Sequence, residues 1–323
     1  MKAKRLRFLG FAMDGLARSP RWERILLIWR RTVGVLRILY KNRSGMTGIA
    51  ILTFFILMGV VGPTVNWWIF PLCNPNDVIS NSDPTQILKP PSWEHPLGTD
   101  ERGIDVLSDL AYGTRNSLIV GFSAALITMV IGTIVGLAAG YYSRMADEIL
   151  MRTTDMFLVL PWIPLAVILA TVLPPQDSPS LYKIIVVIGI TSWPMTARMV
   201  RSQVLSIKER GFVERAKSIG AGGGHILRRH VLPNAFPLIF ANMILSVSVA
   251  VLSEAFLAYF GLENPQSITW GLMLYHAQFF GGFATRAFWY ILPPGLSIAL
   301  VVVSFSLLGY ALDDILNPRL RRR

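Results

Sequence analysis

Long uncharged runs separate the charged positions of this 323-residue chain. Five runs contain no Asp, Glu, Lys or Arg, and each is at least 21 residues long. About 20 apolar residues suffice to cross the hydrocarbon core of a bilayer. A sixth run is shorter, but Lys183 and Arg198 at its ends have side chains long enough to reach both interfaces. The pattern predicts six membrane-spanning helices, over residues 44–76, 116–143, 156–176, 184–197, 231–253 and 287–312.

Smaller patterns mark individual spans. Gly132, Gly136 and Gly140 recur at every fourth position, and such a small-residue ridge permits close helix packing. Asp155 opens the third span and Pro161 follows it, which predicts a kink or an unwound entry. Inside a bundle, broken backbone is tolerated only where protein or a water-filled path satisfies it. Asp155 and Pro161 are therefore candidates for a translocation path or gate.

Glu254 is the acidic residue near the outer end of the fifth span. Ionisable residues within membrane spans are rare and usually face the bundle interior or an aqueous path. A shift of one helical turn would instead place this carboxylate among the lipid headgroups. Both positions, in the path or at the interface, remain open from the sequence.

Composition agrees with an all-α membrane protein. Hydrophobic residues make up 53% of the chain, charged residues only 15%, and the mean hydropathy is +0.49. A soluble domain carries about 25% charged residues. The net charge is +12, a value that nucleic-acid-binding proteins also reach, but no soluble domain is left to present a basic surface. Nucleic acid is therefore not an expected partner.

The placement of the basic residues predicts the orientation. With the N-terminus inside, the inner segments 1–45, 142–155, 198–231 and 313–323 hold 26 of the 31 Lys and Arg residues. Cytoplasmic loops of membrane proteins carry such an excess. We expect a multi-pass protein of the cell membrane with both termini in the cytoplasm.

Residues 1–45 form a basic N-terminal segment. After Ser19-Pro20, apolar residues that include Trp22 and Trp29 recur at helical spacing, with basic residues mostly on the other side. A basic amphipathic helix of this kind lies in the plane of an anionic membrane surface. The alternative is a helix packed on the protein's own spans.

The outer segment before the second span contains a compact stretch, residues 93–118. Thr99 or Asp100 is placed to cap a helix that follows, because both side chains accept hydrogen bonds from a first helical turn. This helix would lie along the outer interface and end at Gly113, since glycine commonly follows a helix.

The inner segment 198–231 is long for a connector, since most connections have about 4–6 residues. Glu214 to Ile219 can form a short helix, and Gly220 is placed to end it. Pro233 marks the return to the membrane. The residues alone allow a solvated basic loop in contact with lipid headgroups.

The order of residues in this segment is more specific. Glu214, Ala216, Gly220, His230, Leu232 and Pro233 form the pattern Glu-x-Ala-x-x-x-Gly-x9-His-x-Leu-Pro. It resembles the loop by which permeases of ABC importers dock on their ATPase, and His230 resembles the dipeptide and oligopeptide (peptide/nickel) branch. Further motifs resemble the smaller, C-type permease subunit of such systems: His95-Pro-Leu-Gly98-Thr-Asp100, Asp105-Val-Leu-Ser108, Gly113-Thr-Arg115, Asp155, Pro161, Glu254-Ala255, Phe260-Gly261-Leu262 and Trp270-Gly271.

The resemblance implies a type I (MetI-like) importer permease fold with a core of five helices. It also implies four kinds of partner: a second homologous permease, two ABC ATPase subunits, an extracytoplasmic solute-binding protein and the lipid membrane. Arg210, Arg215 and Lys217 would join Glu214 in the docking contacts. The expected domains are an N-terminal segment 1–45, a first span with its outer loop 46–115, a core 116–316 with a coupling loop 198–231, and a basic tail 317–323.

Several positions depart from the family pattern. Ile104 stands where an arginine is usual, and Arg215 where the second alanine of the docking motif is. Gly222-Gly223-Gly224 replaces a more varied stretch. These departures affect the outer motif and the stiffness of the coupling loop rather than the transporter class.

Catalytic signatures are missing from the sequence. The glycines at 220–224 lack the lysine and hydroxyl of a phosphate-binding loop, and the four histidines show no metal-ligand spacing. We expect no enzyme activity, no cofactor and no metal site. Two alternatives remain: the same machinery carrying oligosaccharides or a metal chelate such as nickel, and an ion-coupled secondary transporter that uses Asp155 or Glu254.

Overall fold

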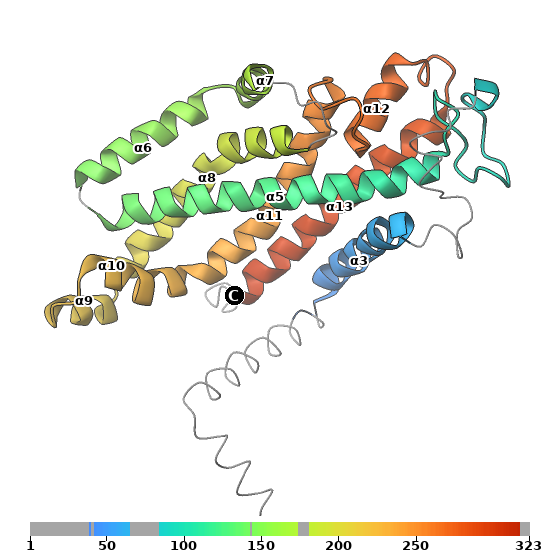
Figure 1. Ribbon diagram of the computed structural model, residues 1–323. Helices are drawn as coiled ribbons and strands as arrows, with labels where there is room; N and C mark the ends of the chain where they lie inside the picture. Colours follow the sequence, from blue (N-terminus) through green and yellow to red (C-terminus); the bar gives the residue numbers. More distant parts are fainter. Residues whose placement is uncertain (1–38, 40–41, 65–83, 143, 174–180, 317–323) are drawn as a thin grey trace, which may run out of the picture.

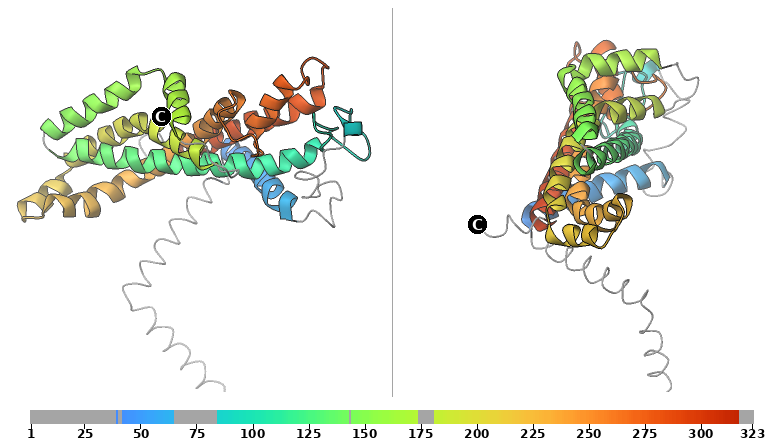
Figure 2. Two further views of the ribbon diagram at one scale, coloured as in Figure 1. Left: turned by 45° about the horizontal axis from the view of Figure 1, so that its top comes forward. Right: turned by 90° about the vertical axis from the view of Figure 1, so that its left-hand side faces the viewer.

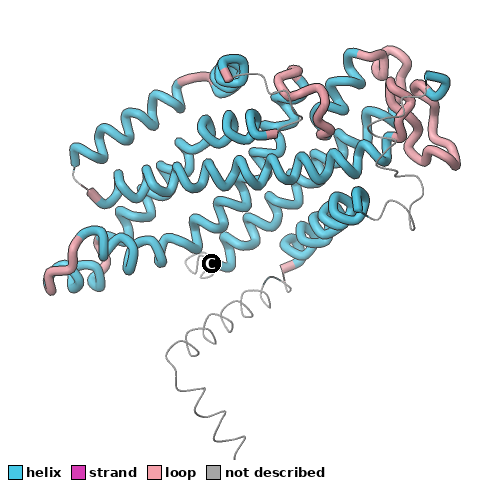
Figure 3. Tube along the Cα trace, viewed as in Figure 1, coloured by secondary structure: helices cyan, strands magenta, loops and turns pink. Residues whose placement is uncertain are grey.

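A computed structural model describes residues 39, 42–64, 84–142, 144–173 and 181–316. The predicted amphipathic helix of the N-terminal segment and the basic tail 317–323 lie outside these residues. Within the described ranges the chain forms helices and loops and no strand (Figure 3). The helices are α3 (Arg43–Thr64), η1 (Pro84–Gln86), α5 (Val106–Tyr141), α6 (Arg144–Val159), α7 (Trp162–Val172), α8 (Tyr182–Lys208), α9 (Gly211–Ser218), α10 (Gly223–Ile226), a π-helical turn (Leu227–Val231), α11 (Leu232–Tyr259), α12 (Trp270–Phe279) and α13 (Phe288–Leu316).

Five of these helical segments are long and apolar enough to cross a membrane: Arg43–Gly62, Val106–Tyr141, Tyr182–Lys208, Gly223–Tyr259 and Phe288–Leu316. The pair α6 and α7 passes the same test when taken together, but the two helices are bent by 94°. The break lies at Leu160 and Pro161, where the sequence predicts a kink. The bent pair is the sixth candidate span, so the all-α membrane fold is confirmed.

The long helices run alongside one another, and two ends of the bundle can be told apart (Figure 1). The short helices α9 and α10 lie at one end, together with the start of α6. The helix α12 and the loop before α5 lie at the opposite end, as the left view of Figure 2 also shows. Side chains at the two ends therefore belong to separate sites.

The glycine ridge of α5 packs directly on α8. A Cβ atom at Gly136 would lie 2.6 Å from the carbonyl oxygen of Ala197 and 2.7 Å from Cβ of Val200. A Cβ at Gly132 or Gly140 would meet α8 equally closely, at 2.6 and 2.8 Å. Since real Cβ atoms do not approach so near, only glycine permits this helix spacing.

The prediction of a separate helix along the outer interface is wrong. The helix that follows the outer loop is α5, whose 36 residues continue without interruption through Gly113 to Tyr141. Its N-cap is Asp105, not Thr99 or Asp100, because the Asp105 carboxylate accepts a hydrogen bond from the Ser108 amide at 2.9 Å. Gly113 does not end a helix; it is buried where a Cβ would lie 3.1 Å from Trp270.

The inner segment 198–231 is more helical than its polarity suggests. The helix α8 continues past Ala197 to Lys208, and α10 begins at Gly223. Charged side chains on this part of α8 have polar partners: Arg201 donates to both carboxylate oxygens of Asp147 on α6, at 2.5 and 2.7 Å. Charged residues therefore extend the helix beyond the uncharged run that marks the span.

Candidate functional site

The short helix α9 projects at one end of the bundle and has two distinct faces. Val213 and Ala216 are 0% and 6% exposed and belong to an apolar cluster with residues of α8 and α11 that includes Ile207 and Ala235. Glu214, Arg215 and Lys217 are exposed on the other side. The apolar face therefore holds α9 against the bundle and leaves its charged face exposed.

Both ends of α9 are defined by backbone hydrogen bonds. The carbonyl of Arg210, the N-cap residue, accepts from the amide of Val213 at 2.8 Å. At the other end the Gly220 amide donates to the carbonyl of Lys217 at 2.9 Å, with φ at +82°. Glycine adopts this left-handed conformation without strain. Gly220 ends the helix as the sequence predicts.

The return to the bundle passes through a π-helical turn. This turn, Leu227–Val231, contains His230 and leads directly into α11, whose first two residues are Leu232 and Pro233. A wider turn accommodates the missing amide of proline, since π-turns interrupt the regular pattern of helix hydrogen bonds. The His230 ring lies 6.2 Å from the ring of Phe212, so this histidine lies beside the first turn of α9.

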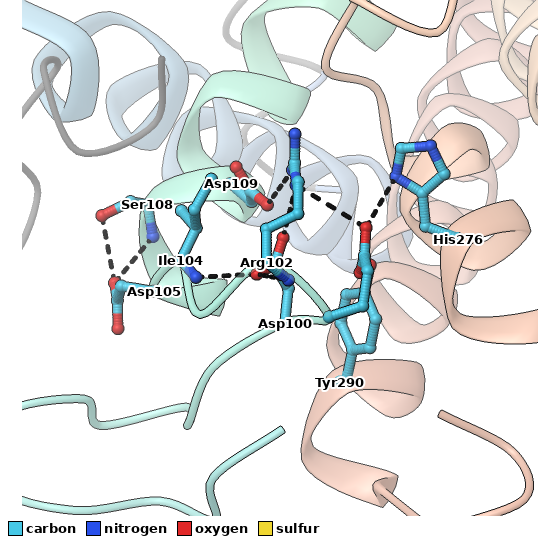
Figure 4. Close-up of polar contacts among 9 residues, drawn as sticks. Asp100, Arg102, Ile104, Asp105, Ser108, Asp109, His276 and Tyr290 are labelled. Carbon is cyan, nitrogen blue, oxygen red and sulfur yellow. Dashed lines mark hydrogen bonds and ion pairs between the residues drawn. The ribbon is translucent and has the colours of Figure 1, made fainter. Parts of the chain in front are cut away.

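At the opposite end, residues of the outer motif form a polar cluster (Figure 4). Asp100 is fully buried, and its Oδ1 accepts from the amides of Arg102 and Ile104 at 2.8 and 2.7 Å. The Arg102 guanidinium donates to Asp100 at 3.0 Å and to Asp109 at 3.2 Å. A single basic side chain thus lies between two buried carboxylates.

Glu101 links this cluster to two later helices. Tyr290 of α13 donates its hydroxyl to Glu101 at 2.5 Å, and His276 Nδ1 of α12 lies 3.2 Å from the other carboxylate oxygen. Burial alone would raise the pKa of Glu101, but the hydrogen bonds from His276 and Tyr290 outweigh it and hold that pKa below the ordinary value. The carboxylate therefore stays charged and holds the loop against α12 and α13.

The other residues of the outer motif have separate places. His95 Nδ1 lies 3.3 Å from Asp105 Oδ1, and Gly98 has φ at +68°, tightly packed against Trp289. These residues shape the loop that precedes α5. The Arg115 side chain is exposed, on the first part of α5, and does not join the cluster.

The predicted path residues are not brought together. A cavity of about 760 Å³ opens between the α6–α7 bend, α8 and α11. Pro161 lines this cavity, as do the uncharged polar residues Thr191, Thr196, Asn242 and Ser246. Asp155 lies outside it, 55% exposed, with its carboxylate 2.5 Å from Arg198.

Glu254 also lies away from this cavity. Its side chain is fully buried and is approached by Ser117 of α5 and by Glu263 and Thr269 of the connection after α11. Neither carboxylate oxygen has a hydrogen-bond partner among the described residues. The position is thus inside the protein, neither among headgroups nor in the open cavity.

Several polar residues of the outer end are not evident from the sequence: Glu101, Arg102, Asp109, Glu263, His276 and Tyr290. Glu101 and Tyr290 are 189 positions apart. The only local signal is the density of acids around Arg102, and it carries no indication of α12 or α13.

Two family comparisons cover most of the chain. Residues 132–322 match the family described as a binding-protein-dependent transport system inner membrane component. Residues 29–91 match the N-terminal transmembrane domain of oligopeptide transport permease C. The first match includes α9, α12, α13 and every residue that lines the cavity except Thr128.

Individual relatives are similar over nearly the full length. The dipeptide transport system permease protein DppC of Alkalihalophilus pseudofirmus is 35% identical over 91% of this chain and 90% of its own. The protein of the same name in Bacillus subtilis is 38% identical over 91% of this chain and 85% of its own. The oligopeptide transport system permease protein OppC of Bacillus subtilis is 33% identical over 87% of this chain and 88% of its own.

Proposed function

Because this chain belongs to the family of binding-protein-dependent transport system inner membrane components, in its dipeptide and oligopeptide ABC permease branch, we propose that it forms half of the membrane path of a peptide importer. The other half is a second, homologous permease subunit. Two ABC ATPase subunits hydrolyse ATP, and an extracytoplasmic binding protein delivers the peptide. The permease itself catalyses no reaction.

The helix α9 carries this proposal. It presents Glu214, Arg215 and Lys217 outward while Val213 and Ala216 hold it to the bundle. Such a helix suits a contact with another subunit, because its charged face is free and its apolar face is fixed. Closure of the ATPase dimer would push α9, and α8 and α11 would move with it as rigid bodies.

The cavity beside the α6–α7 bend is the proposed wall of the peptide path. Its polar lining residues are uncharged, and Pro161 lies where the two helices bend. Uncharged hydrogen-bonding groups accept a peptide backbone without selecting the charge of its side chains. Selection among peptides would then belong mainly to the binding protein.

The orientation follows from the charges. The end of the bundle that holds α9 faces the cytoplasm, with both termini, and the outer cluster faces the other side of the cell membrane. Docking then occurs where ATP is available.

The double variant Glu214→Ala, Gly220→Asp tests the coupling role. Asp at Gly220 is strained because φ is +82°, and Ala at 214 removes a charge from the docking face. We expect peptide uptake into vesicles to be abolished and the ATPase subunits to be lost on purification. The control is Glu209→Ala, an exposed acid just before α9, which should keep both.

Energy coupling is the decisive readout. Uptake that persists in vesicles without ATPase subunits and follows an ion gradient would overturn the proposal in favour of a secondary transporter. If uptake requires ATP but peptides are not transported, the protein is still an importer subunit, and its cargo is an oligosaccharide or a metal chelate.

A further inference from the structure

Two acidic side chains are buried side by side where α11 meets the connection to α12. Glu254 is 0% exposed and Glu263 is 3% exposed. Thr269 donates its hydroxyl to Glu263 Oε2 at 2.7 Å, but Glu263 Oε1 and both carboxylate oxygens of Glu254 have no donor in the part of the chain that the structure describes. Buried polar atoms are almost always hydrogen-bonded, so three such atoms at one junction require an explanation.

Among the residues that the structure describes, no basic side chain is paired with either of the two acids. The charges of Glu254 and Glu263 act on one another, and the other groups that face them are the hydroxyls of Ser117, Ser267 and Thr269. No Lys, Arg or His of the described residues is among them. Two like charges in such a site cannot both be maintained, because burial and mutual repulsion disfavour ionisation.

The junction has little room for a larger cation. A water-sized cavity of about 10 Å³ lies nearby. It is lined by Ser267 and Thr269, and also by Arg102, Asp109 and His276, but by neither carboxylate. Around the acids the backbone is tightly packed: a Cβ at Gly271 would lie 2.7 Å from Cα of Ala255. A proton is the cation that fits, since it turns one carboxylate into a donor for the other.

We propose that Glu254 and Glu263 form a proton-binding site, and that the bound proton holds the outer ends of α5, α11 and α12 together. Two hydrogen bonds tie the start of α12 and the segment before it to α5: Asn116 donates to the Ile268 carbonyl at 2.7 Å, and the amide of Trp270, the first residue of α12, donates to Ser117 at 3.2 Å. When Glu263 releases its proton to extracytoplasmic water, a negative charge is left buried at this joint and the segment moves away from α5.

The proton would be released near neutral pH. Burial raises the pKa of Glu263 to about 7, from an ordinary value of 4.5. A raised carboxyl pKa means that the closed junction binds a proton that the open one releases. The stability of the closed junction therefore falls as the pH rises from about 4.5 to about 7, and it levels off above that pH.

Hydrogen–deuterium exchange of residues 260–270 tests the site, on the assembled importer in lipid nanodiscs and without any transport assay. After correction for intrinsic exchange, we expect protection of this segment to fall about tenfold between about pH 6 and about pH 8. Glu254→Gln and Glu263→Gln should each abolish this fall, because the amide donates to the remaining carboxylate at every pH. The exposed acid Glu94, changed to Gln, should keep it.

Either glutamine variant alone decides the outcome, so failure of one to assemble leaves the test intact. A wild-type segment whose corrected protection is independent of pH would overturn the proposal. The same holds if the fall in protection persists in a glutamine variant. Infrared spectroscopy gives a second readout: a signal of a protonated carboxyl should disappear between about pH 6 and about pH 8, and this pH-dependent signal should be absent from Glu263→Gln.

Discussion

Arg102 balances the charge of the outer cluster, and its replacement tests that role. It donates to Asp100 and Asp109, which are 0% and 1% exposed. Removing one partner of a buried ion pair leaves an uncompensated charge and costs about 3–5 kcal/mol. Since Arg102 is 37% exposed, water compensates part of this loss, and we expect Arg102→Ala to cost about 2–3 kcal/mol.

The comparison with Arg102→Lys makes this prediction specific. Lysine keeps the charge but cannot donate to both carboxylates at once. Arg102→Lys should therefore lose roughly half as much unfolding free energy as Arg102→Ala. Thermal unfolding of the purified protein and protease resistance of residues 84–105 measure the difference. Equal stability of the alanine and lysine variants would show that charge compensation is not the reason for Arg102.

Asp105 provides the second prediction at the residue scale. Its carboxylate accepts from the Ser108 amide and hydroxyl at 2.9 and 3.0 Å and so caps α5. Asp105→Ala should lower stability by about 1 kcal/mol, whereas Asp105→Asn, which keeps an accepting oxygen, should be nearly neutral. Chemical denaturation of the three proteins distinguishes the cap from a role of the charge in the contact to His95.

The outer motif shows why residue identity can be predicted but partners cannot. The sequence marks Asp100 and Asp105 as candidates, since short acidic side chains favour turns and caps. Which one caps α5 depends on Gly98 and Gly103, whose φ values of +68° and +78° turn the chain back so that Asp100 faces inward. The pairing of Glu101 with His276 and Tyr290 depends on tertiary packing, and no local pattern encodes it.

At the scale of elements, uncharged runs locate the spans but not their lengths. The runs predict α3, α5, α8, α11 and α13 because membrane helices exclude charge. They underestimate the length of α8, because the charged residue Arg201 remains in the helix and is paired with Asp147. Pro161 predicts a break in the third span; its 94° angle follows from packing that a single proline does not specify.

The contact between α5 and α8 gives the prediction at this scale. Gly136→Ala would place a methyl group 2.6 Å from the Ala197 carbonyl, so the helices must separate. We expect a loss of about 1–3 kcal/mol, the usual cost of overpacking. Gly295→Ala in α13 is the matched control, because among the described residues no atom of a neighbouring element lies within 4 Å of the place that its methyl group would take.

Unfolding of the isolated subunit in detergent measures both changes. The control should be neutral or slightly stabilising, since alanine favours helix more than glycine does. If both variants were equally stable, close approach along the glycine ridge would not determine the spacing of α5 and α8.

On the scale of the whole molecule, the separation of the two ends is the basis of the proposed function. The proposed docking helix α9 and the carboxyl pair at Glu254 and Glu263 lie at opposite ends of one long helical segment, Gly223–Tyr259. This segment starts beside α9 and ends shortly after Glu254. A rigid helix of this kind can transmit a displacement from one end to the other. The outer junction would respond to ATPase movement without direct contact.

Cysteine labelling tests this arrangement across the membrane. With the single native cysteine, Cys73, changed to Ser, three exposed positions report on the two ends: Trp93 outside, and Met145 and Ser218 inside. A membrane-impermeant maleimide should label Trp93→Cys in intact cells, and Met145→Cys only in inverted vesicles. Labelling of Met145→Cys from outside would contradict the orientation.

Ser218→Cys adds the docking surface to the same experiment. Ser218 lies on α9, so the cysteine should be labelled in inverted vesicles that have been stripped of ATPase subunits. When those subunits are bound, labelling should slow about tenfold or more, because an occupied interface excludes the reagent. Met145→Cys, at the same end but on α6, should label equally in both. Because only position 218 should respond to the ATPase, unequal protection of the two inner positions separates docking on α9 from a general closing of the cytoplasmic face.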